Sequence, residues 1–171
     1  MASALKNLSD YNEKNIPSAE DMRFGIVVSD WNADITHALY EGCFETLVKH
    51  GAKEENIFVA QVPGAFELPF GAKTLASGKR LNALICLGAV IKGETKHDEY
   101  INHAVATGLT GLGLALGIPC IFGLLTPNTH QQALDRAGGK HGNKGVEAAV
   151  SAIRMAALRE KSAARGAKIG F

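Results

Sequence analysis

The stretch LICLGAVIKGETKHDEY, from Leu84 to Tyr100, carries the pattern on which the fold prediction depends. Its apolar start, Leu84 to Leu87, is typical of a strand buried on both faces of a parallel sheet. A glycine-containing turn follows, and the turn leads into a segment with helical periodicity. The free N–H groups at the start of that helix suit a phosphate, and His97 adds a side chain that exchanges a proton near neutral pH. The first hypothesis is therefore an enzyme that acts on a small phosphorylated substrate.

Alternating strand and helix patterns extend from this stretch in both directions. Strands are predicted at 23–29, 56–62, 82–91 and 118–125. Helices are predicted at 34–50, at a short segment ending near Gly78, and at 97–117, 128–137 and about 143–160. This α/β pattern predicts a three-layer α/β/α sandwich with a central four-stranded parallel sheet, flavodoxin-like in type.

Residues 1–171 contain no linker, internal repeat or low-complexity segment, so a single domain is expected. Residues 1–22 are polar, and they are expected to form either a flexible arm or an edge strand supplied to a neighbour. The tail at 161–171 is basic and is expected to be frayed.

The composition restricts the class of protein. The net charge is +1, which gives no electrostatic reason to expect a nucleic acid or an anionic membrane as a partner. The three cysteines have no metal-ligand spacing, so buried reduced thiols are expected rather than disulfides or a metal site. No apolar segment resembles a signal peptide or a membrane span. We therefore expect a soluble, cytoplasmic protein.

Four loops follow the four predicted strands. They begin at Asp30-Trp31-Asn32, at Pro63 to Glu67, at Val90 to Asp98 and at Thr126-Pro127-Asn128. Because the carboxyl ends of parallel strands meet at one edge of a sheet, these loops are expected to converge on one site.

Three residues of the first two loops, Trp31, Asn32 and Glu67, have two interpretations each. Trp31, the only tryptophan, either stacks on a planar heterocycle or packs at the rim of the sheet. Asn32 either hydrogen-bonds a ligand or caps the next helix. Gly64 and Ala65 would let a backbone approach a ring closely. Glu67 either binds hydroxyl groups or is a first-turn acid favoured by the helix dipole.

Two later segments are candidates for a phosphate site, and each also has a structural interpretation. Thr95 either caps the helix or donates to a phosphate, whereas Asp98 and Glu99 are expected to be first-turn acids. The segment DRAGGKHGNKG at 135–145 is glycine-rich and basic. It is either a structural turn between two helices or an anion clamp, in which an arginine would make bidentate contacts. No dinucleotide or P-loop signature occurs in the chain.

Five motifs at matching spacing resemble the lumazine synthase family over about residues 22–159. They are WN at 31–32, PGAFELP at 63–69, GAVIKGETKHDEY at 88–100, IFG at 121–123 and RAGGKHGNKG at 136–145. The resemblance implies a transferase of riboflavin biosynthesis. It would condense 5-amino-6-(D-ribitylamino)uracil with 3,4-dihydroxy-2-butanone 4-phosphate to give 6,7-dimethyl-8-ribityllumazine, phosphate and water, the penultimate step of the pathway, without a metal or other cofactor.

The resemblance also implies a role for each matching residue. Trp31 would stack on the pyrimidine, Asn32 and Lys144 would bind its polar edge, Val90 and Ile91 would contact it through backbone groups, and Phe122 would close the pocket. Ala65, Phe66 and Glu67 would hold the ribityl chain. Glu94 and Thr95 would present N–H groups to the phosphate, Arg136 would be its cationic partner, and His97 would be the catalytic proton shuttle. Phe122, Arg136 and Lys144 would come from a neighbouring subunit.

The resemblance further implies a homo-oligomer, namely a pentamer that in some family members packs into a 60-subunit shell. Riboflavin synthase is a further candidate partner. Two residues depart from the family pattern. Trp31 replaces the more usual Phe, and Asp98 replaces an aromatic residue. The Asp98 carboxylate either approaches His97 or faces solvent.

Three competing interpretations remain on the sequence alone. One is the related archaeal-type riboflavin synthase, against which the intact PGAFELP and KGETKHDEY motifs argue. Another is a flavin-binding or shell protein with little catalysis, which the departures at Trp31 and Asp98 leave open. The third is a generic flavodoxin-like binding domain, which explains none of the spacing.

Overall fold

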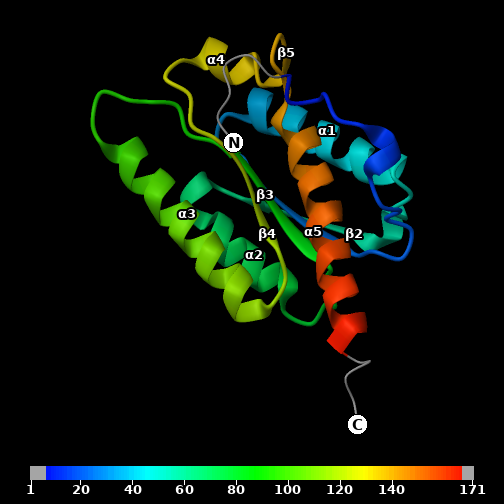
Figure 1. Cartoon of the computed structure of the whole chain (residues 1–171). Coiled ribbons are helices and arrows are strands. Elements are labelled where there is room, and N and C mark those ends of the chain that lie inside the picture. The colour runs from blue at the N-terminus through cyan, green and yellow to red at the C-terminus, as the bar shows by residue number, and fades with distance from the viewer. Residues whose placement is uncertain (1–6, 167–171) are drawn as a thin grey trace.

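The computed structural model describes residues 7–166, and in it a four-stranded parallel sheet has the strand order β2-β1-β3-β4 (Figure 1). The elements are η1 (Glu13–Asn15), β1 (Phe24–Ser29), α1 (Ala33–Lys49), η2 (Glu54–Asn56), β2 (Ile57–Val62), η3 (Ala65–Glu67), α2 (Leu68–Ala76), β3 (Ala83–Ala89), α3 (His97–Leu116), β4 (Cys120–Leu125), α4 (His130–Leu134), β5 (Ala137–Gly139), β6 (Gly142–Asn143) and α5 (Lys144–Gly166). The predicted sheet is confirmed.

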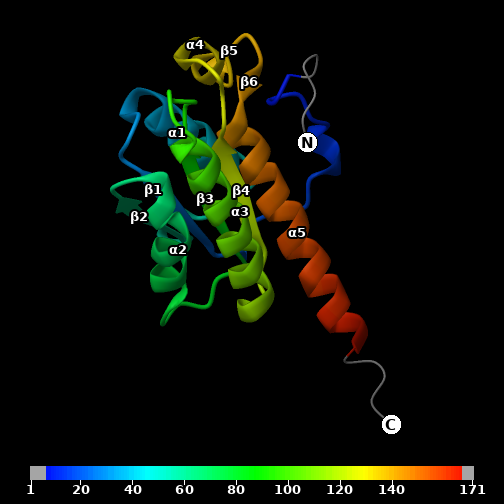
Figure 2. The same cartoon turned by 90° about the vertical axis from the view of Figure 1, so that its left-hand side faces the viewer.

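Helices cover both faces of the sheet, as the two views show (Figures 1 and 2). One apolar cluster fills the layer between the sheet and the helices α1 and α5, and a second fills the layer between the sheet and α2 and α3. The strands β1 and β3 are buried along their whole length, as central strands of a parallel sheet must be. The predicted three-layer α/β/α sandwich is therefore confirmed.

The region after β4 differs from the sequence prediction. The helix expected at 128–137 is only the short α4, and residues 137–143 form an antiparallel hairpin of β5 and β6. Gly138 and Gly142 of this hairpin have φ angles of 113° and 78°, a left-handed backbone that glycine adopts without strain. The long helix predicted from about 143 begins at Lys144, close to the predicted position, but it ends six residues later than predicted.

α5 continues to Gly166, past the predicted end at 160. The sequence from Lys161 to Arg165 contains no proline or glycine, so nothing interrupts the helix before Gly166. The expectation of a frayed tail is therefore wrong for 161–166, and its remainder, residues 167–171, lies outside the described residues.

Residues 7–22 lie against their own chain. The Leu8 N–H donates to the His141 carbonyl oxygen at 2.7 Å, and the Ala19 N–H donates to the His50 carbonyl oxygen at 2.8 Å. The Tyr11 hydroxyl and the His50 Nε2 atom share a hydrogen bond of 3.0 Å. These contacts connect the segment to α1 and to the β5–β6 turn. Residues 1–6 of the predicted arm lie outside the described part of the chain.

Candidate active site

The loops that leave the carboxyl ends of β1, β2 and β3 enclose a pocket of about 810 Å³. Nine of the thirteen predicted site residues line it, namely Trp31, Asn32, Ala65, Phe66, Glu67, Val90, Ile91, Thr95 and His97. Three of the four loops predicted to converge therefore do so in a single chain, whereas the loop that begins at Thr126-Pro127-Asn128 contributes no residue to this pocket.

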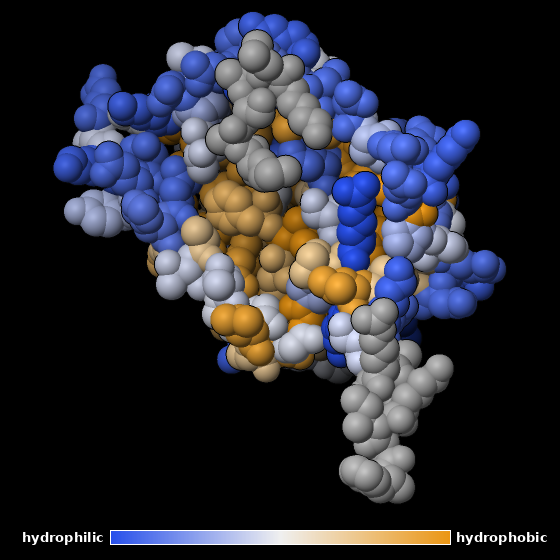
Figure 3. Space-filling model, in the orientation of Figure 1, coloured by the Kyte–Doolittle hydropathy of each residue, from blue (hydrophilic) through white to orange (hydrophobic). Residues whose placement is uncertain are grey.

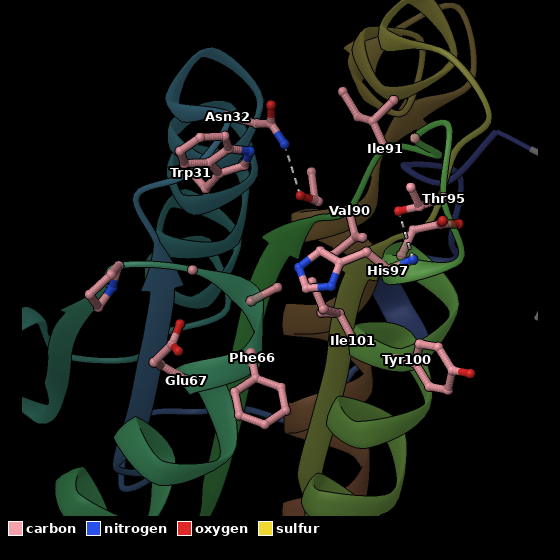
Figure 4. A pocket seen from close by; sticks show the side chains of 16 residues that line it. Trp31, Asn32, Phe66, Glu67, Val90, Ile91, Thr95, His97, Tyr100 and Ile101 are labelled. Atoms are coloured by element: carbon pink, nitrogen blue, oxygen red, sulfur yellow. Dashed lines mark hydrogen bonds between the residues drawn. The ribbon is translucent and has the colours of Figure 1, made fainter.

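The loop after β1 is tied to both neighbouring loops. The Trp31 N–H donates to the Pro63 carbonyl oxygen at 3.1 Å, and the Asn32 Nδ2 donates to the Ala89 carbonyl oxygen at 2.9 Å (Figure 4). Asn32 has a φ of 63°, a left-handed conformation that asparagine tolerates better than most residues. Its side chain makes no capping bond to α1. The capping interpretation is therefore wrong, and Oδ1 of Asn32 is left for a ligand.

Trp31 lines the pocket, and the residue is 73% exposed. The interpretation as a packed rim residue is therefore wrong for the isolated chain, because most of the indole surface remains open. An exposed indole can stack on a planar heterocycle without displacing a protein neighbour.

The loop after β2 supplies a carboxylate and an aromatic ring. A Cβ added at Gly64 would lie 3.0 Å from Oε2 of Glu67, so glycine leaves space for this carboxylate beside the backbone. Glu67 directly precedes α2 and makes no side-chain cap there. Its oxygens can therefore accept hydrogen bonds from hydroxyl groups in the pocket. Phe66 is 60% exposed beside it.

The loop after β3 brings a helix N-terminus to the pocket. α3 begins at His97, whose N–H donates to Oγ1 of Thr95 at 3.4 Å. The His97 ring is turned into the pocket, whereas the ring of Tyr100 points away from it (Figure 4). No ion pair joins His97 to a carboxylate within residues 7–166. Asp98 also lines the pocket, on the same helical turn.

The other four predicted residues do not line this pocket. Glu94 lies in the same loop, between two residues that do. Phe122 is on β4 and is 37% exposed. Nη1 of Arg136 donates to the Gln132 carbonyl oxygen at 3.0 Å, and Nζ of Lys144 lies 2.6 Å from Oε1 of Glu147. The pocket of a single chain therefore contains only nine of the thirteen predicted site residues.

The pocket also contains residues to which the sequence analysis gave no role in the site. They are Pro63, Ala89, Gly93, Asp98, Tyr100 and Ile101, and the pocket also contains Gly64, which was expected to let a backbone approach a ring. Most belong to the quoted motifs, and Ile101 follows His97 by four residues, the spacing that places two side chains on one face of a helix. That spacing could have identified Ile101.

The thiols are separate from this site. Burial raises the pKa of Cys43 and Cys86 far above the ordinary thiol value, and it raises the pKa of Cys120 to about 11. A protonated thiol is a poor nucleophile. Within residues 7–166, no cluster of His, Cys, Asp and Glu could hold a metal ion. None of the helices in that range has the length and apolar character needed to cross a bilayer.

Comparison with known proteins identifies the family. A sequence profile described as 6,7-dimethyl-8-ribityllumazine synthase matches residues 21–160. The chain belongs to the 6,7-dimethyl-8-ribityllumazine synthase family. The lumazine synthase of Parabacteroides distasonis is 56% identical over 91% of this chain and 97% of that protein. Those of Phocaeicola vulgatus and Flavobacterium psychrophilum are each 50% identical, over 94% and 100% of this chain and over 96% and 88% of their own lengths.

Membership in the lumazine synthase family makes the chain an enzyme, a transferase of riboflavin biosynthesis. The family match includes all three loops of the pocket and also the segment that carries Phe122, Arg136 and Lys144.

Proposed function

We propose that the protein condenses 5-amino-6-(D-ribitylamino)uracil with 3,4-dihydroxy-2-butanone 4-phosphate to form 6,7-dimethyl-8-ribityllumazine, phosphate and water, as the penultimate step of riboflavin biosynthesis. The 5-amino group attacks the ketone carbonyl and water is lost to give an imine. Phosphate elimination, attack by the ribitylamino nitrogen and a second loss of water close the ring. The observation that carries the proposal is one pocket that combines an exposed indole, a free carboxylate and a helix N-terminus beside a histidine.

The pyrimidine end of the pocket is formed by the loops after β1 and β3. In this proposal the indole of Trp31 stacks on the heterocycle, and Oδ1 of Asn32 accepts from one of its N–H groups. The backbone of Val90 and Ile91 borders the same ring. The ribityl chain extends along Ala65 and Phe66 toward Glu67, whose carboxylate accepts from the hydroxyl groups.

The phosphate end is the start of α3. The helix dipole and the free N–H groups there favour an anion, and the N–H groups of Glu94 and Thr95 extend this site. His97 is the first residue of α3, and its ring is turned into the pocket from this end (Figure 4). It moves protons between the amine, the carbonyl oxygen and the leaving water. Holding both substrates in one pocket removes much of the entropy barrier of a bimolecular reaction.

The missing residues come from a neighbouring subunit in this proposal. Phe122, Met155 and Leu158 are exposed apolar residues of β4 and α5, and apolar atoms gather on this face between α3 and α5 (Figure 3). A second exposed apolar pair is formed by Phe66 of η3 and Phe70 of α2. α2 packs on β1, β2 and β3 rather than along β4. Two different apolar surfaces suit head-to-tail contacts, which form a ring when the rotation between subunits closes.

These two exposed surfaces support a homo-oligomer in which Phe122, Arg136 and Lys144 of one chain complete the pocket of the next. We propose a pentamer, and a 60-subunit shell as its higher assembly, in the cytoplasm, with small-molecule substrates. An association with riboflavin synthase belongs to the same proposal, which includes no nucleic acid or membrane partner.

The direct test is an assay of lumazine formation. The purified protein is mixed with both substrates, and lumazine absorbance and fluorescence are followed after subtraction of the slow uncatalysed condensation. Acceleration that saturates in both substrates is expected. An assembled protein that binds riboflavin but does not accelerate the reaction would instead support a flavin-binding shell.

Arg136→Ala is expected to raise the KM for butanone phosphate about tenfold or more and to leave the KM for the pyrimidine nearly unchanged. A hydrogen bond to a charged group contributes about 1.5–3 kcal/mol. Steady-state kinetics with each substrate varied in turn measure both constants. Arg136→Lys keeps the charge but loses the forked donor, so an intermediate KM is expected. The control Arg154→Ala removes an exposed arginine of α5 and should leave both KM values unchanged. An unchanged KM for butanone phosphate in Arg136→Ala would contradict the role of Arg136 as the partner of the phosphate.

A further inference from the structure

Asn143, the residue before α5, is bonded to three separate segments. Its Nδ2 donates to the Ala38 carbonyl oxygen of α1 at 2.8 Å. Its Oδ1 accepts from the Gly145 N–H at 2.7 Å, which caps the first turn of α5. Its own N–H donates to Oγ of Ser9 at 2.9 Å. One side chain therefore fixes the start of α5 on the middle of α1.

Two glycines make this contact close. A Cβ added at Gly42 of α1 would lie 2.6 Å from Nδ2 of Asn143. A Cβ added at Gly145 would overlap the Leu39 carbonyl oxygen and lie 3.0 Å from Oδ1 of Asn143. The amide therefore has little freedom to move, because both helices leave only enough space for it in its present position.

The two cationic residues assigned to the reaction are joined to this amide through the backbone. Lys144 follows Asn143 directly, and its N–H donates to the Arg136 carbonyl oxygen at 2.8 Å. Ala137 is opposite Asn143 in the hairpin. The two side chains are also hydrogen-bonded, because Arg136 donates to the Gln132 carbonyl oxygen and Lys144 donates to the Glu147 carboxylate. A shift of Asn143 would therefore move Arg136 and Lys144 together.

We propose that Asn143 is a positioning residue, which locks Arg136 and Lys144 as one cationic unit against α1 so that both reach the pocket of the neighbouring subunit in register. The inference rests on the proposed function, in which these two residues act on the next chain. Asn143 itself touches no substrate. Displacement of a positioned group by about 1 Å can reduce a rate by about a hundredfold, so a change at Asn143 acts at a distance.

An ordinary helix cap is the competing explanation. Loss of a cap lowers stability by about 1 kcal/mol and does not alter the KM of any substrate. Asn82 provides a matched control at the opposite end of the sheet. Its Oδ1 accepts from the Arg23 N–H at 2.8 Å and its Nδ2 donates to Oε1 of Glu160 at 2.7 Å.

The experiment compares Asn143→Ala, Asn82→Ala and the unmodified protein by lumazine formation with each substrate varied. Asn143→Ala is expected to lower kcat/KM for both substrates at least about tenfold, whereas Asn82→Ala keeps the unmodified values at a similar loss of thermal stability. Equal kcat/KM in the two variants would overturn the inference. An inactive unmodified protein would overturn the proposed function itself, and the inference with it.

Gly42→Ala keeps the test decisive if Asn143→Ala does not fold. This substitution leaves Asn143 in place and raises the helix propensity of α1 by about 1 kcal/mol, yet its methyl group pushes the amide away. The same fall in kcat/KM in a folded protein is expected. Full activity of Gly42→Ala would contradict the inference.

A mixing experiment tests whether the effect reaches the neighbouring subunit. Asn143→Ala and Trp31→Ala subunits are co-expressed with different tags. In a mixed ring about a quarter of the sites combine an intact pocket with an intact cationic unit. Activity well above that of either parent is therefore expected, and activity no higher than the mean of the parents would overturn a role across the subunit boundary.

Discussion

The variant His97→Ala is expected to lose about a hundredfold in kcat and still to form lumazine measurably above the uncatalysed background. A positioned acid–base group contributes roughly 10²–10⁴-fold, and we expect the lower end because the other residues still hold both substrates together. The KM values should change little, since the imidazole acts on protons rather than on binding. Steady-state kinetics after subtraction of the background measure both constants.

The matched control for this variant is His103→Ala. His103 lies on the same helix, α3, and is exposed, and it does not line the pocket. It should keep the unmodified kcat. Complete loss of activity in a correctly assembled His97→Ala protein would contradict the expectation, because it would mean that proton transfer, and not positioning, provides most of the acceleration.

The sheet could be predicted because the sequences of β1 and β3 themselves indicate burial on both faces. Each is a short, continuous apolar run, and such a run is buried only if helices cover both faces of the sheet. The hairpin at 137–143 could not be predicted in the same way. Its short strands have no apolar alternation, and its form depends on left-handed conformations at Gly138 and Gly142. A glycine permits such a conformation but does not require it.

The site could be predicted to the extent that its residues lie at the ends of consecutive parallel strands. Trp31, Glu67 and His97 each follow a strand, so the topology alone brings them to one edge. The hydrogen bond from Asn32 to the Ala89 carbonyl oxygen joins two loops far apart in the sequence. No local pattern marks such a contact, and the same holds for the bond from Asn143 to Ala38.

Gly145→Ala is expected to be the most destabilising single-methyl substitution that we consider, with a loss of more than about 4 kcal/mol in the free energy of unfolding. The added methyl group would overlap the Leu39 carbonyl oxygen, an atom of the α1 backbone that cannot turn aside as a side chain can. The start of α5 would have to move off α1. That movement would open the apolar layer in which α1, α5 and the sheet pack together.

Thermal and urea unfolding of the purified variant measure this loss, and Gly111→Ala is the matched control. Gly111 lies within α3, and a Cβ there meets no atom within 4 Å. Alanine favours a helix over glycine by about 1 kcal/mol, so the control should keep or slightly raise the stability of the chain. If Gly145→Ala unfolded at the same temperature as Gly111→Ala, the close contact between α5 and the α1 backbone could not be a fixed feature of the fold. The positions of Arg136 and Lys144 would then lack the rigid support that their proposed roles require.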